Sequence, residues 1–265
     1  MKRIMVSVML MLICCVGTPS GVHGDPLEFS TALSKGMEPF YDLEERNGTL
    51  EATGMCLEII DAFVKKAPEF HFTYELDLIP FARVKKYLRN NTIQAEFCIA
   101  RTAERETWYQ YTDTPLYPVK FGILARADDR DVQHITTYDE IARLGGTMLG
   151  IRGANALEVF QEQTAHLNIP VYATPTVEQS LKMLLTGRGR YFVYNHYALI
   201  DGAKKLGYQD KVVMLPLVVK ETFHWLAFSK AVPQEVVQQA NAVLRELQES
   251  GELQRIYEKY GTLPF

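Results

Sequence analysis

Apolar residues follow two different periods along this chain, and stretches of one period alternate with stretches of the other. Short apolar or alternating runs, typical of β-strands, cover residues 27–31, 70–76, 95–100, 121–125, 147–151 and 191–194. Apolar residues spaced three or four positions apart predict helices from near Cys56, Pro80, Asn155, Val177 and Pro233, and a last short helix after Gly251. Strands that alternate with helices predict an α/β fold.

The first 24 residues have a pattern of their own. Lys2 and Arg3 precede an apolar run that extends to Val16, and small residues follow as far as Gly24. These are the parts of a secretory signal peptide, and the run is shorter than the roughly 20 apolar residues of a membrane span. We therefore expect cleavage between Gly24 and Asp25 and a periplasmic mature protein.

Lipidation is a weaker alternative for the same segment. It would use Cys14 or Cys15, but a lipoprotein site needs a small residue before the cysteine. Ile13 and Cys14 stand there instead.

The charge balance argues against one class of partner. The chain has 28 Lys and Arg against 32 Asp and Glu, a formal net charge of −4. Residues 1–24 carry two basic and no acidic side chains, so the mature chain has 26 basic against 32 acidic groups. Nucleic-acid-binding proteins normally show a strong basic excess, and no nucleic-acid partner is expected.

No common catalytic or cofactor motif occurs in the chain. GxSxG, HExxH, the P-loop and the dinucleotide fingerprint are all missing. The histidines of the mature chain show no metal-ligand spacing; they are His71, His134, His166, His196 and His224. We therefore expect no metal, no cofactor and no catalytic residue.

Several strings together resemble the family 3 solute-binding proteins, the periplasmic receptors that feed polar amino-acid ABC transporters. The main strings are 99–106, 111–117 and the ending 246–261. Further matches are Pro39-Phe40, Gly54 with Glu58, Ile79-Pro80 and 150–153. The resemblance covers nearly the whole mature chain. It implies a two-lobed periplasmic binding protein type II fold with a ligand cleft between the lobes.

The resemblance also implies lobe limits and partners. Lobe 1 would comprise 25–117 and 224–265, and lobe 2 would comprise 118–218, with hinges near 116–119 and 218–223. A monomer is expected, with a small-molecule ligand and an inner-membrane ABC permease as its partners.

Five residues are candidates for the ligand site, and three of them match ligand positions of the family. Arg105 matches the arginine that holds the ligand α-carboxylate, for which a planar guanidinium is well suited. Arg101 is a second basic group in the same loop, and Phe40 matches an apolar wall. Asn155 opens a helix whose free N–H groups point into the cleft, and Arg83 lies one turn into another helix. The alternatives are a surface ion pair for Arg105, core for Phe40, an ordinary N-cap for Asn155 and a solvated charge for Arg83.

The chain departs from the family at other ligand positions. Cys56 replaces an aspartate, and Cys98 and Ala100 replace hydroxyl residues. Asn195 aligns with the acid that grips the α-ammonium, and Met37 stands where a stacking tyrosine is common. We therefore expect acidic or non-amino carboxylates to bind better than common α-amino acids. The alternative is that Glu38 or Glu58 reaches the cleft and binds the amine in place of that acid.

Cys56 and Cys98 are the only cysteines of the mature chain. Their family positions lie at the same rim of the cleft, and disulfides are common in exported proteins. A disulfide between them is expected, with Cys56 starting the first helix and Cys98 ending a strand. Two buried thiols are the alternative.

The resulting hypothesis is a periplasmic protein that captures a small carboxylate-bearing solute for ABC-transporter uptake. Relatives with dehydratase or peptidoglycan-cleaving activity suggest an enzyme as one alternative. Such an enzyme needs a positioned acid such as Glu58 or Glu178. A binding module that reports to a sensor is the other alternative.

Overall fold

A computed structural model describes residues 26–35 and 39–260. The predicted signal peptide, Met37, Glu38 and the last five residues lie outside the described residues. Within the described part, strands and helices alternate as the sequence predicts, and the α/β class is confirmed.

The centre of the molecule is an eight-stranded mixed sheet. Six strands follow one another in the order β11 (Val171–Thr174), β10 (Met148–Ile151), β12 (Tyr191–Asn195), β9 (Tyr117–Arg126), β14 (Lys220–Ser229) and β7 (Ala95–Ala100). Two more strands pair off this path: β13 (Val212–Met214) with β9, and β8 (Tyr109–Tyr111) with β14.

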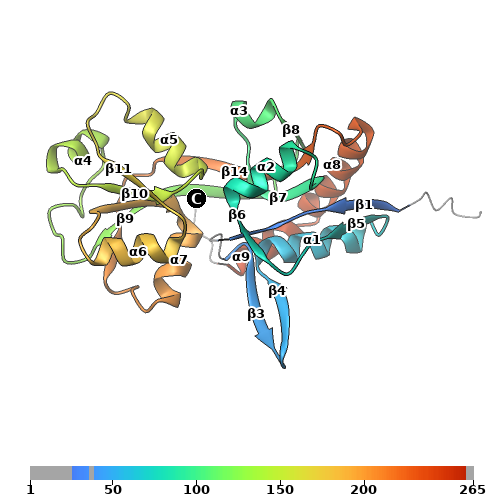
Figure 1. Ribbon diagram of the computed structural model, residues 1–265, viewed down its shortest axis with the longest axis horizontal. Helices are drawn as coiled ribbons and strands as arrows, with labels where there is room; N and C mark the ends of the chain where they lie inside the picture. The colour runs from blue at the N-terminus through green and yellow to red at the C-terminus, as the bar shows by residue number, and fades with distance from the viewer. Residues whose placement is uncertain (1–25, 36–38, 261–265) are drawn as a thin grey trace, which may run out of the picture.

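Strands β9 and β14 connect the two halves of the molecule. They pair with each other antiparallel, from Tyr117 opposite His224 to Phe121 opposite Lys220. Beyond this segment, β9 pairs with β12 on one side, and β14 pairs with β7 and β8 on the other. Figure 1 shows these two long strands running between two groups of helices.

We name the larger group lobe 1. It contains β7, β8 and three two-stranded sheets, which pair β1 (Leu27–Ser30) with β5 (Phe70–Thr73), β2 (Leu33–Lys35) with β6 (Leu78–Pro80), and β3 (Asp42–Arg46) with β4 (Thr49–Thr53). Its helices are α1 (Met55–Lys66), α2 (Phe81–Arg89), α3 (Ala103–Glu106), α8 (Gln234–Glu249) and α9 (Glu252–Glu258).

The other group is lobe 2, on the left of Figure 1. It contains β10 to β13 and the helices α4 (Tyr138–Leu144), α5 (Asn155–Gln163), α6 (Val177–Leu185) and α7 (His196–Lys205). The residue limits and hinges predicted for the lobes stay a prediction.

An aromatic cluster holds lobe 1 together. Phe63 of α1 packs edge-on against Phe70, Phe72 and Phe97, with ring centroids 5.2 to 6.0 Å apart. Burial of such rings is the main source of folding free energy. The cluster joins α1 to β7, the strand whose carboxyl end borders the interlobe cavity described below.

Two differences from the predicted elements have simple causes. The strand predicted over 70–76 ends at Thr73 because its partner β1 ends at Ser30, opposite Thr73. The hairpin of β3 and β4 was not predicted, because its strands are mostly polar and exposed. No helix in the described part of the chain is long and apolar enough to cross a membrane.

Candidate ligand-binding site

A cavity of about 40 Å³ lies between the two lobes. It is bordered by the carboxyl ends of three strands: Ala100 ends β7, Ile151 ends β10 and Asn195 ends β12. Ligands of α/β sheets bind at this end of the strands. Its lining residues are Lys35, Phe81, Cys98, Ala100, Arg105, Phe121, Ile151, Ala154, Asn155, Ala156, Tyr194, Asn195 and His224.

Arg105 is the charged side chain at the centre of this site. The loop after β7 leads into α3, where the Thr102 hydroxyl accepts a hydrogen bond from the Arg105 backbone N–H at 3.2 Å. The Arg105 side chain is only 2% exposed. Its Nη1 donates to the Ala100 carbonyl at 3.1 Å, and its carbon lies 5.3 Å from the centre of the Phe81 ring. These contacts aim the guanidinium toward lobe 2.

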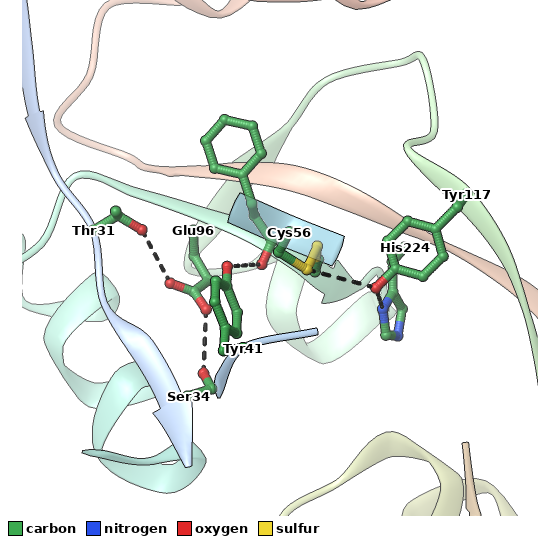
Figure 2. Close-up of a disulfide and its surroundings, with 9 residues drawn as sticks. Thr31, Ser34, Tyr41, Cys56, Glu96, Tyr117 and His224 are labelled. Carbon is green, nitrogen blue, oxygen red and sulfur yellow. Dashed lines mark hydrogen bonds between the residues drawn. A yellow bond between two sulfur atoms is a disulfide. The ribbon is translucent and has the colours of Figure 1, made fainter. Parts of the chain in front are cut away.

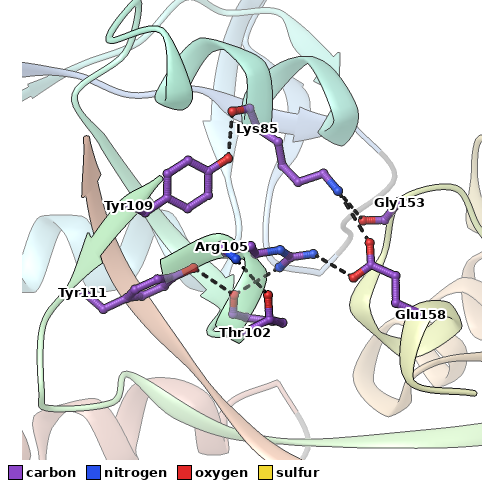
Figure 3. Close-up of polar contacts among 8 residues, drawn as sticks. Lys85, Thr102, Arg105, Tyr109, Tyr111, Gly153 and Glu158 are labelled. Atoms are coloured by element: carbon purple, nitrogen blue, oxygen red, sulfur yellow. Dashed lines mark hydrogen bonds and ion pairs between the residues drawn. The ribbon is translucent and has the colours of Figure 1, made fainter. Parts of the chain in front are cut away.

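Glu158 of α5 meets Arg105 from across the cleft (Figure 3). Its Oε2 lies 3.4 Å from Arg105 Nη2, and its Oε1 lies 3.5 Å from Lys85 Nζ. Lys85 also donates to the Gly153 carbonyl at 3.2 Å. A carboxylate of lobe 2 therefore pairs with a cation from α3 and another from α2.

A second ion pair joins the lobes elsewhere. Lys205 Nζ of α7 lies 2.7 Å from Asp42 Oδ2 of β3.

In this arrangement the cavity is much smaller than the roughly 300 Å³ of a typical small-molecule site. The lobes must therefore part to admit a solute, and a solute carboxylate must compete with Glu158 for Arg105.

Asn195 combines a structural and a site position. It is the N-cap of α7, and its Oδ1 accepts a hydrogen bond from the Tyr197 backbone N–H at 3.0 Å. The side chain is 3% exposed, and its Nδ2 has no hydrogen-bond partner among the described residues. Since Tyr197 N–H can only donate, the oxygen must face α7 and the amide N–H groups face away from it.

Helix α5 begins at the cavity wall. Asn155 is its first residue, and Ala154 is its N-cap and has no side-chain hydrogen bond to offer. Within the described residues, the backbone N–H groups of Asn155 and Ala156 have no acceptor. The first N–H groups of a helix favour negatively charged or carbonyl oxygens.

A disulfide joins Cys56 to Cys98, the pairing predicted (Figure 2). The two Cα atoms are 6.2 Å apart. Cys98 has a positive φ of 63° and lies where the pairing of β7 with β14 shifts register, between Trp225 and Ala227. Such a bulge re-aims a side chain, and here Cys98 lines the cavity two residues before β7 ends.

Three aromatic rings support the floor beside the disulfide. Tyr117 Oη lies 2.7 Å from His224 Nδ1, and Phe40 stacks on Tyr117 at 5.5 Å. Burial first, and the charge of Arg105 second, lower the pKa of His224 to about 3. The imidazole therefore faces the cavity as a neutral group at pH 7.

A family model for bacterial extracellular solute-binding proteins, family 3, matches residues 30–263. The chain belongs to this family. A comparison with curated proteins found no match.

Solved structures agree with the predicted type II binding-protein fold. The substrate-binding protein of an amino acid ABC transporter is 18% identical, with a TM-score of 0.72, and the match covers 88% of this chain and 99% of that one. A histidine kinase sensor domain with similarity to periplasmic binding proteins is 16% identical, with a TM-score of 0.75 over 89% and 96% of the two chains. An ancestral amino-acid-binding protein, a precursor of cyclohexadienyl dehydratase, is 16% identical, with a TM-score of 0.73 over 89% and 96%. At these identities the likeness concerns the fold.

Three predicted ligand residues of this solute-binding protein line the cavity, and three do not. Arg105, Asn155 and Asn195 line it. Phe40 is fully buried and packs behind Tyr117 and His224, so it is part of the core under the cavity.

The two other arginines point elsewhere. Arg101 is half-exposed, pairs with Glu106 and lies 5.6 Å from the centre of the Tyr111 ring. Arg83 is exposed and lines a separate hollow of lobe 1. Arg83 points away from the cavity because of the orientation of α2. Val84 faces the core, and Lys85, on the other side of Val84 from Arg83, reaches lobe 2.

Sequence reasoning missed several residues of the site. These are Lys35, Phe81, Tyr194, His224, and the interlobe pair Lys85 and Glu158. Two of them lie next to positions that the family resemblance identified. Phe81 directly follows the Ile79-Pro80 match, and His224 is the first residue of the second segment predicted for lobe 1, 224–265. Across the described residues, no group of three or more His, Cys, Asp or Glu side chains could hold a metal ion.

Proposed function

We propose that this family 3 protein is exported to the periplasm, with its signal peptide removed after Gly24. There it binds a small carboxylate-bearing solute between the lobes as a monomer and presents it to an inner-membrane ABC permease. No chemical step is required. The solute favours a closed arrangement of the lobes, and that shift in population is the signal that the permease reads.

One observation carries this proposal: a buried guanidinium at an interlobe cavity. Arg105 is fixed by the Ala100 carbonyl and presents its remaining N–H groups toward lobe 2. A buried cation needs an anionic partner, and Glu158 now fills that place from a half-exposed position. A solute carboxylate can replace it with two parallel hydrogen bonds, which are stronger and more specific than one.

The acids that an enzymatic alternative needs lie away from the cavity. Glu58 accepts a hydrogen bond from Tyr260 Oη at 2.8 Å and pairs with Lys259, and Glu178 pairs with Lys182 on the surface of α6. Neither lines the cavity. This supports binding without catalysis.

Calorimetric titration of a carboxylate panel tests the proposal. Arg105→Ala should weaken binding by roughly 2–5 kcal/mol, because a desolvated carboxylate loses its partner. Arg105→Lys keeps the charge but not the planar fork of donors, so it should bind with intermediate affinity. Residual binding by this variant would show that the protein folds without the guanidinium. Arg101→Ala is the matched control and should bind normally. Binding by Arg105→Ala within a factor of two of the wild type would contradict the proposal.

A further inference from the structure

Several of the polar groups that face the interlobe cavity are hydrogen-bond donors. They include the guanidinium of Arg105, the free N–H groups at the start of α5 and the Nδ2 of Asn195. The Ala100 carbonyl already accepts hydrogen bonds from Arg105 and from Tyr111 Oη, the latter at 3.1 Å. The cavity is therefore built to receive oxygen acceptors.

Asn195 is the clearest evidence that the cavity favours hydrogen-bond acceptors. Its oxygen caps α7, so only its NH₂ group is left for a solute. That nitrogen is buried and has no partner among the described residues. A buried donor without an acceptor costs free energy, and a solute oxygen would supply the acceptor.

An ammonium group finds the opposite environment. Two cations, Arg105 and Lys35, line the cavity, and no carboxylate of the described residues does. His224 is neutral there. A buried ammonium without an opposite charge is strongly unfavourable.

Among the described residues, the carboxylates that pair with Arg105 or share the neighbouring hollow with Lys35 are already paired with lysines. Glu158 contacts Lys85 as well as Arg105, so it keeps a cation when a solute takes Arg105. Asp42 and Asp201, in the hollow beyond Lys35, both pair with Lys205, at 2.7 and 3.1 Å.

We propose that the solute is a 2-oxo or 2-hydroxy carboxylic acid and not an α-amino acid. Its carboxylate binds Arg105, and its α-oxygen accepts a hydrogen bond from Asn195 Nδ2 or from the first N–H groups of α5. This proposal rests on the proposed function, in which the cavity is the solute site, and it names the class of solute.

Matched pairs of solutes test whether the site prefers a 2-oxo acid to an amino acid, even though the side chain of the natural solute is unknown. Each 2-oxo acid is compared with the amino acid of the same side chain, for example pyruvate with alanine, 2-oxoglutarate with glutamate and phenylpyruvate with phenylalanine. Calorimetry on ligand-stripped mature protein should find, in every pair that binds, the 2-oxo acid at least tenfold tighter. Tighter binding of the amino acid would overturn the proposal and leave the proposed function standing. If no member of any pair binds, the proposed function fails, and this proposal fails with it.

Two variants of Asn195 locate the cause. Asn195→Asp keeps the helix cap but turns a carboxylate oxygen to the cavity, so the ratio of 2-oxo acid to amino acid affinity should fall at least tenfold. Asn195→Ser also keeps the cap but adds no charge; 2-oxo acid binding should weaken with no gain for the amino acid. Thermal unfolding without solute checks that both variants fold. An unchanged ratio in folded Asn195→Asp would overturn the assignment of the α-substituent to this residue.

Discussion

Two buried titratable side chains lie on the neighbouring strands β7 and β14, and burial shifts their pKa values in opposite directions. Burial raises the pKa of Glu96 on β7 to about 8, even though the Thr31 and Ser34 hydroxyls donate to its carboxyl oxygens. Burial and Arg105 lower the pKa of His224 on β14 to about 3. In both cases the low-dielectric interior favours the neutral form. At pH 7 both side chains are therefore mainly neutral.

Glu96 should make the protein less stable as the pH rises. Its folded pKa of about 8 lies above the ordinary value of 4.5, so its stabilising contribution is complete below about pH 4.5 and is lost as the pH rises through about 8. The loss by pH 7 is on the order of 3 kcal/mol. Glu96→Gln removes the titration, so its free energy of unfolding should exceed that of the wild type by an amount that grows from pH 5 to pH 8.

Urea unfolding at several pH values checks this expectation. The difference between the variant and the wild type cancels the contribution of His224, whose low folded pKa makes stability fall as the pH drops below about 6.5. Glu75→Gln, which removes an exposed carboxyl group instead of a buried one, is the control. A difference between Glu96→Gln and the wild type that does not change with pH would contradict the account.

At the scale of elements, apolar periodicity predicted the parts that build the core and missed those that do not. The buried strands β7, β10 and β12 and the amphipathic helices α1 and α8 were predicted because their inward faces are apolar. The hairpin of β3 and β4 has charged, exposed strands, and its signal was the turn Asn47-Gly48, where both residues have positive φ. The direction of a side chain within a helix was also hard to predict from the sequence. On α2 the prediction chose Arg83 for the cleft, whereas Lys85 is the residue that reaches lobe 2.

The disulfide between α1 and β7 should contribute substantially to stability. It closes a loop with a sequence separation of 42 residues, for which the chain-entropy model gives about 4 kcal/mol, at the top of the typical range of about 2–4 kcal/mol. The double variant Cys56→Ala, Cys98→Ala should lose stability of that order in urea unfolding. Denatured, unreduced wild-type protein should show no free thiol from these two residues, and two free thiols would contradict the bond.

A second double variant isolates the backbone at Cys98. Its φ of 63° suits glycine, whereas alanine there costs about 1–2 kcal/mol. Cys56→Ala, Cys98→Gly should therefore be more stable than Cys56→Ala, Cys98→Ala. Equal or lower stability of the glycine variant would show that the left-handed backbone is not retained without the disulfide.

The contact of α5 with α2 and α3 should compete with the solute. Glu158→Gln removes the carboxylate that pairs with Arg105 and Lys85, so a solute carboxylate should bind about fivefold tighter, equivalent to roughly 1 kcal/mol for a partly exposed pair. The solute-free variant should also have a larger radius of gyration in solution scattering, because an interlobe contact is gone. Glu178→Gln, which loses a surface ion pair within α6, is the control. Unchanged affinity and scattering for Glu158→Gln would show that Glu158 does not hold the lobes together.

At the scale of the molecule, the family resemblance predicted the fold. The side chains that meet at the cavity, and the direction of their polar groups, could be identified only from the structure. Motif strings are short and local, so they identified Arg105 and Asn195 but not Glu158, which acts across the cleft. The direction of the Asn195 amide follows from its hydrogen bond to Tyr197, a relation that residue identity alone does not contain. The preference for one class of solute therefore depends on contacts between chain segments far apart in sequence.

Export should yield a mature chain that begins at Asp25. The basic, apolar and small-residue regions of 1–24 are typical of a secretory signal peptide, so we expect cleavage after Gly24. N-terminal sequencing of periplasmic protein checks the site. A chain that retains Met1, or one lipidated at Cys15, would contradict it.

The most direct test of the central claim is mass spectrometry of the solute that copurifies with periplasmic protein. We expect one small organic acid per wild-type chain, with a carboxylate and no α-amine, and none with Arg105→Ala. A solute without a carboxylate, or the same amount of solute bound to Arg105→Ala, would contradict the account.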